Sequence, residues 1–292
     1  MELVIRIIGI ITPVLIISAF GFGYAKLRQP DLGVVNRLST DMLYPLLIYT
    51  AMASKDFRLL HYLPLIGGGL VVLFGSGLIA WAVARMLHYN PHAFIPSMMF
   101  TNVANMGLPL TLFAFGPEML PAAVALFMAF SLVHFSIGIR LCAPQVSTKG
   151  ILRGPMLWAM IAGVVSSLLG ITLPDWLAAS TKMLGDAAIP LGLFTVGVGF
   201  ATFRVERWSI GIVGAVLCPL SGLLIAWPLV QFLPMSKAMQ GVLLLYAALP
   251  PAVMNYIFAD RYQQDPGLVS AIVVVGNIAS IVFVPLALYL AI

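Results

Sequence analysis

The chain has 292 residues, of which 61% are hydrophobic and only 9% are charged. Soluble domains carry about 25% charged residues, so a soluble fold of this length could not cover its surface. The net charge of +5 comes from basic residues that stand mostly singly in short polar breaks, a pattern typical of membrane loops and not of a nucleic-acid-binding face. The composition predicts a polytopic helical membrane protein without a sizeable soluble domain.

Ten apolar runs, each long enough to cross a bilayer as a helix, follow one another along the chain. The longest polar break, at 142–152, separates two halves of five spans. We therefore expect a first domain at 1–141, a cytoplasmic linker at 142–152 and a second domain at 153–292. The ten predicted spans lie near 3–27, 33–54, 62–88, 94–115, 119–141, 153–173, 176–201, 207–233, 237–259 and 267–291.

The two halves resemble each other in sequence. Segment 37–50 carries a basic residue, an acid four residues later, a proline four residues after that, and then Leu, an aromatic residue and Thr. Segment 182–195 repeats this order 145 residues further along. A repeat with an odd number of spans inserts its second copy upside down, as in many secondary transporters. We predict an all-α membrane protein of two inverted five-helix repeats.

The basic residues predict an orientation. Of the fifteen Lys and Arg residues, ten fall on one side of the predicted spans and five on the other. The positive-inside rule places the richer side in the cytoplasm, so both termini are expected outside the cell. The protein should therefore be a multi-pass protein of the plasma membrane, in bacteria the inner membrane.

Two predicted spans, the fourth and the ninth, contain proline and glycine residues that interrupt a helix. We place the breaks at 105–109 and 250–254. Two opposed half-helix N-termini at membrane depth would attract an anion without a buried Lys or Arg. The alternative is a pair of packing kinks. The residues predicted to form the substrate site, with Asn105 as the main side-chain contact, are Asn102, Asn105, Gly107, Pro109, Pro250, Pro251 and Asn255.

Asp41 and Asp186 lie within predicted spans, four residues after Arg37 and Lys182 respectively. We favour a local ion pair in each case, and the alternative is a site that couples transport to protons or sodium ions. We interpret His134, which lies deep in a span, as a hydrogen-bonded core residue and not as a proton relay. The sequence contains no nucleophile, metal-binding or nucleotide-binding motif, so no catalytic residue, cofactor or metal is expected.

With these motifs, the chain resembles the auxin efflux carrier family, which includes bacterial malonate-type permeases. The resemblance implies a ten-helix fold like that of the bile-acid/sodium symporters, in which helices 4 and 9 cross at their breaks. It also implies an organic anion as substrate, usually a carboxylate. The motifs that carry the resemblance are Asn105-Met-Gly107-Leu-Pro109-Leu, Leu184-Gly-Asp186-Ala-Ala-Ile-Pro190-Leu, and Leu249-Pro250-Pro251-Ala followed by Tyr262 and Asp265.

The predicted function is therefore secondary transport of a small organic anion by alternating access. A sodium- or proton-coupled exchanger or symporter on the same fold remains the alternative, with Asp41 and Asp186 as its coupling residues. The expected partners are the anion and the lipid bilayer, with a homodimer left open and no nucleic acid.

Overall fold

The computed structural model describes residues 2–28, 30–53, 59–144, 154–202, 205 and 207–292. Within these ranges the chain is helical and contains no strand. Six helices of the described part are long and apolar enough to cross a membrane, and they coincide with six of the ten predicted spans. These six are Glu2–Arg28, Leu60–Met86, Pro117–Cys142, Asp175–Thr202, Trp208–Phe232 and Pro266–Ala291.

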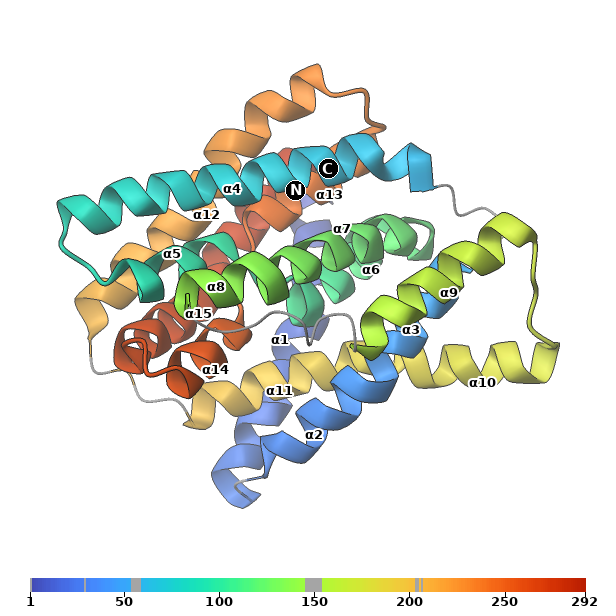
Figure 1. The fold of residues 1–292 in the computed structure, drawn as a ribbon, viewed down its shortest axis with the longest axis horizontal. Coiled ribbons are helices and arrows are strands. Elements are labelled where there is room, and N and C mark those ends of the chain that lie inside the picture. Colours follow the sequence, from blue (N-terminus) through green and yellow to red (C-terminus); the bar gives the residue numbers. More distant parts are fainter. Residues whose placement is uncertain (1, 29, 54–58, 145–153, 203–204, 206) are drawn as a thin grey trace.

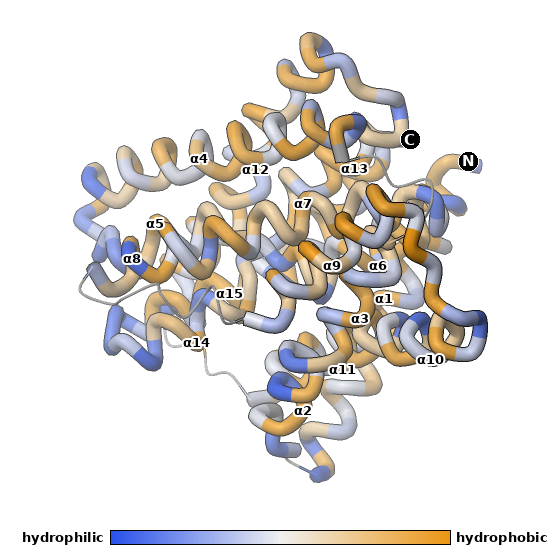
Figure 2. The backbone as a smooth tube through the Cα atoms, turned by 45° about the vertical axis from the view of Figure 1, so that its right-hand side comes forward, coloured by the Kyte–Doolittle hydropathy of each residue, from blue (hydrophilic) through white to orange (hydrophobic). Residues whose placement is uncertain are grey.

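The outer faces of the long helices are apolar. Large side chains such as Phe20, Leu78 and Leu224 are at least two-thirds exposed. Apolar surface on this scale is unfavourable in water and fits contact with lipid tails. Figure 2 shows hydrophobic residues along the lengths of the helices, with hydrophilic residues gathered at helix ends and in connecting segments. The exposed faces therefore support a protein embedded in a bilayer.

The other four predicted spans fall on shorter or interrupted helices. One is continuous but changes its winding to a π-helix over five residues, two are split by an extended break, and one is a single short helix. Their elements are α2 (Leu32–Leu38), η1 (Ser39–Leu43) and α3 (Tyr44–Met52); α5 (Pro91–Met99), η3 (Val103–Gly107) and α6 (Leu108–Phe115); α9 (Pro155–Leu169); and α13 (Lys237–Ala247) and α14 (Val253–Arg261).

The remaining elements build the six long helices, some of them in pieces that run on without a gap (Figure 1). They are α1 (Glu2–Arg28), η2 (Leu59–Tyr62), α4 (Leu63–Met86), η4 (Pro117–Met119), α7 (Leu120–Val133), η5 (His134–Gly138), α8 (Ile139–Cys142), α10 (Asp175–Asp186), α11 (Ala188–Thr202), α12 (Trp208–Phe232) and α15 (Pro266–Ala291).

The helices pack in two groups. In one group, α1 packs against α11 and α3 packs against α9 and α10. In the other, α4 packs against α5, α7, α12 and α13, and α15 packs against α5, α12, α13 and α14. We call these the α1–α11 group and the α4–α15 group. The groups meet where α1 contacts α15 and where α3 contacts α7. Because η3 contacts α11 of one group and α7 of the other, a site near η3 lies between them.

Glycines allow close backbone contact between α1 and α11. A Cβ atom at Gly21 would collide with the carbonyl group of Phe194, and one at Gly197 would collide with that of Ser18. Small residues at such positions let membrane helices approach and gain van der Waals contact. The glycines of α1 and α11 therefore hold these two helices close together, and the pair forms one side of the structure around the site.

Candidate functional site

The two helix breaks cross each other and are joined by their backbones. Thr101 and Pro251 form an antiparallel bridge. The N–H group of Asn102 donates to the carbonyl of Pro250 over 2.7 Å, and the carbonyl of the residue before Thr101 accepts from the N–H of Ala252 over 2.9 Å. Extended backbone inside a membrane must have its polar groups satisfied within the protein. Pairing one break with the other meets this need for both.

The first break lies earlier than we predicted. The segment 105–109 is helical, and the chain leaves the helical conformation at 100–102, between α5 and η3. Pro109 stands in the first turn of α6, directly after a π-helix, and this position tolerates a proline. The wider winding of the π-helix shifts the backbone hydrogen bonds, so that the N–H of Gly107 bonds to the carbonyl of Asn102, five residues back. The second break, at 248–252, overlaps the predicted segment 250–254.

Each break ends at the N-terminus of a helix, and both N-termini lie beside one cavity. The first N–H groups of a helix have no acceptor one turn earlier, and they carry partial positive charge. Ala104 and Asn105 in the first turn of η3, and Val253 and Met254 in the first turn of α14, all line this cavity. The arrangement therefore presents two sets of backbone donors to a single space.

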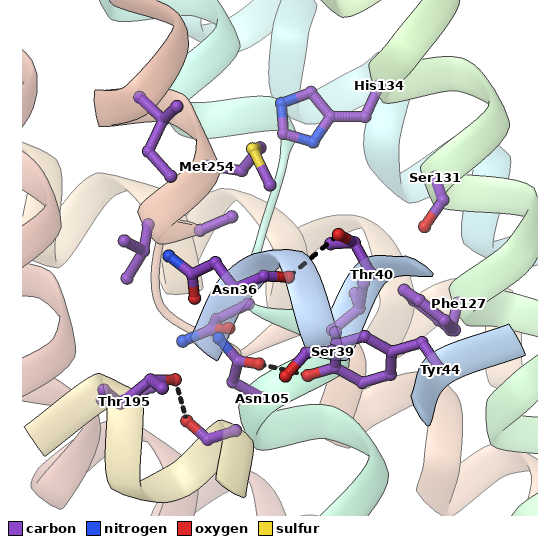
Figure 3. A pocket seen from close by; sticks show the side chains of 18 of the residues that line it. Asn36, Ser39, Thr40, Tyr44, Asn105, Phe127, Ser131, His134, Thr195 and Met254 are labelled. Carbon is purple, nitrogen blue, oxygen red and sulfur yellow. Dashed lines mark hydrogen bonds between the residues drawn. The ribbon is translucent and has the colours of Figure 1, made fainter. Parts of the chain in front are cut away.

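The cavity between the two helix groups has a volume of about 140 Å³. Sites for drug-sized ligands take roughly 300–1,000 Å³, so this cavity suits a small molecule. The described residues that line it carry hydroxyl and amide groups but no Lys, Arg, Asp or Glu (Figure 3). Its polar lining residues are Asn36, Ser39, Thr40, Tyr44, Thr101, Asn102, Asn105, Ser131, His134 and Thr195.

Asn105 is held in place by Tyr44, which was not among the predicted site residues. The buried hydroxyl of Tyr44 donates to the Asn105 side-chain oxygen over 2.5 Å. Gly192 leaves room for this pair, because a Cβ atom there would lie 2.8 Å from the Asn105 oxygen and 3.0 Å from the Tyr44 hydroxyl. With its oxygen engaged, Asn105 turns its amide NH₂ group toward the cavity (Figure 3).

The other two predicted asparagines hold the crossing together. The Asn102 side chain donates to Asn277 over 3.2 Å, and the Asn255 side chain donates to the carbonyl of Phe100 over 2.8 Å. Asn277 in turn donates to the carbonyl of Pro251 over 3.0 Å. Asn277 was not among the predicted site residues either, although a lone amide in the last apolar span was a signal for it. These amides are therefore already used within the protein.

Of the seven residues predicted to form the site, Asn102 and Asn105 line the cavity. The other five lie outside the lining in the described part of the chain, either within a helix or, for Pro250 and Pro251, in the second break itself. They are Gly107, Pro109, Pro250, Pro251 and Asn255.

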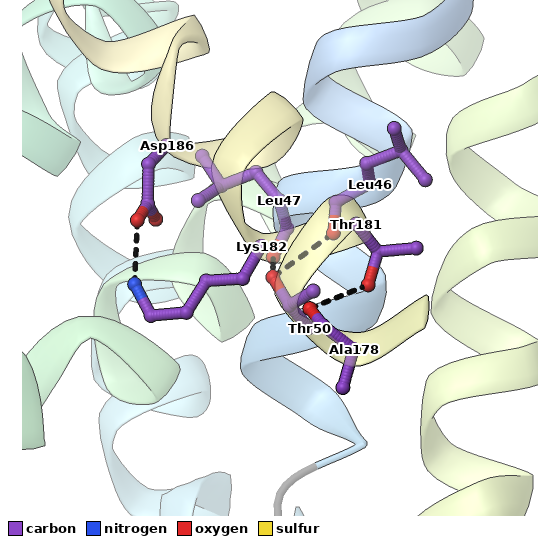
Figure 4. A network of polar contacts seen from close by, with 7 residues as sticks. All are labelled: Leu46, Leu47, Thr50, Ala178, Thr181, Lys182 and Asp186. Carbon is purple, nitrogen blue, oxygen red and sulfur yellow. Dashed lines mark hydrogen bonds and ion pairs between the residues drawn. The ribbon is translucent and has the colours of Figure 1, made fainter. Parts of the chain in front are cut away.

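The two predicted ion pairs have different outcomes. Lys182 and Asp186 form one over 2.5 Å, with the two side chains 68% and 47% exposed (Figure 4). The prediction for Arg37 and Asp41 is wrong, since the ion pairs among the described residues do not include it. The exposed side chain of Asp41 lies instead 3.3 Å from the hydroxyl of Thr40. Neither aspartate lines the cavity.

The family profile described as "Membrane transport protein" matches residues 138–288 of the chain. This stretch covers more than half of the sequence and includes the second break. The chain belongs to this family, that of the auxin efflux carriers. The family assignment made from the motifs is thus confirmed.

The relatives of this chain include plant and bacterial proteins. It is 26% identical over 162 residues to "Probable auxin efflux carrier component 1b" of Oryza sativa subsp. japonica, which is 53% of this chain and 29% of the relative. It is 28% identical over 211 residues to "Putative malonate transporter" of Rhizobium meliloti (strain 1021), 65% of this chain and 64% of the relative. The chain thus matches less than a third of the plant protein's length.

Proposed function

We propose that the transporter carries a small organic anion with a carboxylate group, bound at the crossing of the two breaks. The observation that carries the proposal is the meeting of two helix N-termini at one cavity whose described lining residues include no acidic side chain. The Asn105 amide supplies a side-chain donor beside these N-termini. The relative named for malonate transport supports the same class of substrate, because malonate is a carboxylate.

The donors available suggest modest affinity. Each helix N-terminus contributes roughly 0.3–2 kcal/mol to binding of an anion. A hydrogen bond to a charged acceptor adds about 1.5–3 kcal/mol. Two N-termini and the Asn105 amide therefore sum to roughly 2–7 kcal/mol, which corresponds to a dissociation constant of about 10 µM or weaker. A carrier needs this range, because it must also release its cargo.

We further propose ten membrane-spanning segments in two inverted repeats, 1–141 and 153–292, joined by the linker 142–152. The packing supports this symmetry: α1, the first helix of one half, packs on α11, and α9, the first helix of the other half, packs on α3. The α4–α15 group would move against the α1–α11 group and expose the cavity to each side in turn. We also propose a bacterial inner or plasma membrane location, with both termini outside and a homodimer as the assembly.

Uptake by proteoliposomes of labelled mono- and dicarboxylates tests the proposed function. Asn105→Ala should weaken binding by about tenfold or more, since it removes a hydrogen bond to a charged acceptor. Asn105→Asp, of the same size but negatively charged, should abolish uptake. Asp186→Asn, outside the cavity, is the matched control and should transport normally.

Two outcomes would contradict the proposal. If the wild type takes up no carboxylate, the substrate class is wrong. If Asn105→Asp transports as well as the wild type, the cavity is not the anion site. A loss of sodium or pH dependence in the Asp186→Asn control would instead favour the ion-coupled alternative.

A further inference from the structure

One face of α4 carries a stripe of exposed apolar side chains that ends in a cation. The apolar members follow one another at spacings of three or four residues and are 44% to 67% exposed; they are Val71, Phe74, Leu78 and Trp81. Residues at this spacing lie on the same face of a helix. Arg85, which is also exposed, continues the stripe one turn after Trp81, in the last turn of α4. The face therefore changes from apolar to cationic where the helix ends.

The guanidinium group of Arg85 is oriented but not paired with an acid. Its central carbon lies 4.8 Å from the centroid of the Trp81 ring, which is a cation–π contact. The ion pairs in the described part of the chain do not include Arg85. The ring covers only one face of the guanidinium group, so the N–H groups along its edges can still donate. An arginine held in this way can bind a phosphate group through two parallel hydrogen bonds.

Trp81 and Arg85 are residue types that mark the boundary between the hydrocarbon core and the lipid headgroups. Tryptophan is enriched at this depth, because its ring is apolar and its N–H group is polar. Arginine near a helix end extends its charged group to the same level. Figure 2 shows hydrophobic residues along α4 and hydrophilic residues at its end. A lipid whose acyl chain packs on the stripe would therefore place its headgroup beside Arg85.

The helix α12 carries a similar stripe that ends differently. Its exposed apolar residues include Val216, Leu220, Leu224 and Trp227, and Trp227 stands 146 residues after Trp81. The residue one turn after Trp227 is Gln231, which is exposed as well. The two stripes thus share a terminal tryptophan, and only the stripe on α4 continues to an arginine.

The two helices run in opposite directions. A Cβ atom at Gly68, early in α4, would lie 2.9 Å from Leu233, which directly follows α12, and one at Gly75 would lie 2.6 Å from Ile225. Their C-terminal ends therefore reach opposite sides of the bilayer. In the proposed orientation α4 ends at the cytoplasmic leaflet, whose surface potential is negative because it contains anionic lipids. The arginine thus stands at the leaflet that supplies an anionic partner, and the glutamine at the other.

We propose that Trp81 and Arg85 form a binding site for an anionic phospholipid of the cytoplasmic leaflet. The phosphate binds the Arg85 guanidinium group, and an acyl chain lies along the stripe of α4. A phospholipid matches both halves of this surface, because it joins an apolar chain to an anionic group. The site is separate from the cavity and does not depend on which substrate is carried. Since α4 belongs to the α4–α15 group, the bound lipid attaches that group to the cytoplasmic leaflet.

The test is lipid binding to the purified transporter in detergent, followed by native mass spectrometry. The probes are dioleoylphosphatidylglycerol, which is anionic, and dioleoylphosphatidylcholine, which has the same chains and a zwitterionic headgroup. Arg85→Gln removes the charge, and Gln231→Arg creates the same Trp–Arg spacing on α12. Because detergent abolishes the difference between leaflets, both positions can be compared directly.

Arg261→Gln is the matched control. Arg261 also stands at the end of a helix and lies 5.8 Å from an aromatic ring, that of Tyr262. Within α14, every residue of which the structure describes, Ile257 is the only large apolar side chain that is exposed. The control therefore removes the same charge from a helix without a lipid-facing stripe. Thermal unfolding checks that each variant is folded.

We expect the wild type to bind phosphatidylglycerol more tightly than phosphatidylcholine. Arg85→Gln should weaken binding of the first phosphatidylglycerol about fivefold, the factor that one arginine near an anionic membrane surface provides, and should leave phosphatidylcholine within about twofold. Gln231→Arg should bind one more phosphatidylglycerol with an affinity within about twofold of the first. Arg261→Gln should bind like the wild type.

Three results would overturn the inference. If phosphatidylcholine binds to the wild type as tightly as phosphatidylglycerol, the lipid charge has no role. If Arg85→Gln binds phosphatidylglycerol like the wild type, or loses no more affinity than Arg261→Gln, the surface attracts lipid only through its overall charge. If Gln231→Arg gains no lipid, an arginine one turn after a tryptophan on an apolar stripe does not make a lipid site.

Discussion

The hydrogen bond between Tyr44 and Asn105 makes a strong prediction about how the amide is positioned. Tyr44→Phe removes the hydroxyl that holds the Asn105 oxygen at 2.5 Å and preserves the ring that packs 5.7 Å from Phe127. A neutral hydrogen bond contributes about 0.5–1.5 kcal/mol, which is roughly a twofold to tenfold change in affinity. We therefore expect Tyr44→Phe to weaken carboxylate binding by this factor.

The effect should depend on Asn105, because Tyr44 acts through it. In Asn105→Ala, the further change Tyr44→Phe should have little effect on binding, so the double-mutant cycle should give a coupling energy close to the whole effect of Tyr44→Phe. Equilibrium binding of the carboxylate that proteoliposomes take up best measures all four proteins. Thermal unfolding in detergent checks that each variant is folded. Strictly additive losses in the double mutant would refute the positioning role.

Three further predictions concern other parts of the molecule. Asn277→Leu removes a donor to the Pro251 carbonyl and an acceptor at the crossing, so it should lower the free energy of unfolding by about 1–3 kcal/mol, measured by denaturant unfolding in detergent. Asp41→Asn and Asp186→Asn should keep near-normal uptake, because both carboxylates lie outside the cavity. The exposed ion pair between Lys182 and Asp186 also contributes only about 0–1 kcal/mol to stability. A strong loss of uptake in either variant would establish a coupling site. A C-terminal reporter active only in the cytoplasm should stay silent, and clear activity would reverse the proposed orientation.

The long helices could be predicted from the sequence because their formation depends on local apolar length. The first break could not be placed correctly for a physical reason. Pro109 and Gly107 weaken a helix, but here the chain is already helical from Val103 onward and the wider winding of the π-helix accommodates the proline, so these residues follow the break instead of forming it. The non-helical backbone of Asn102 is fixed by pairing with Pro250, about 150 residues away, and no local pattern carries that information.

The site was predictable only in part, for the same reason. Asn105 stood out as an amide beside helix-breaking residues in an apolar span, and it lines the cavity. Its partner Tyr44 is 61 residues away, and nothing in the sequence joins the two. We interpreted His134 as a hydrogen-bonded core residue. The structure agrees with this interpretation, because His134 is buried, stacks on Phe100 and interacts with the side chain of Asn255, which is 121 residues away and which no local pattern joins to it.

The backbone pairing of the two breaks affects how this architecture can evolve. The donors at the two helix N-termini, and the bonds that tie Asn102 and Ala252 across the crossing, come from the main chain. They persist whichever side chains surround them, so mutations in the cavity wall can change its size and polarity while the proposed anion-binding donors of the main chain stay in place. Substrate range can therefore diverge among descendants of one ancestral carrier by substitution at lining positions such as Thr195 and Ser131, with the crossing inherited unchanged.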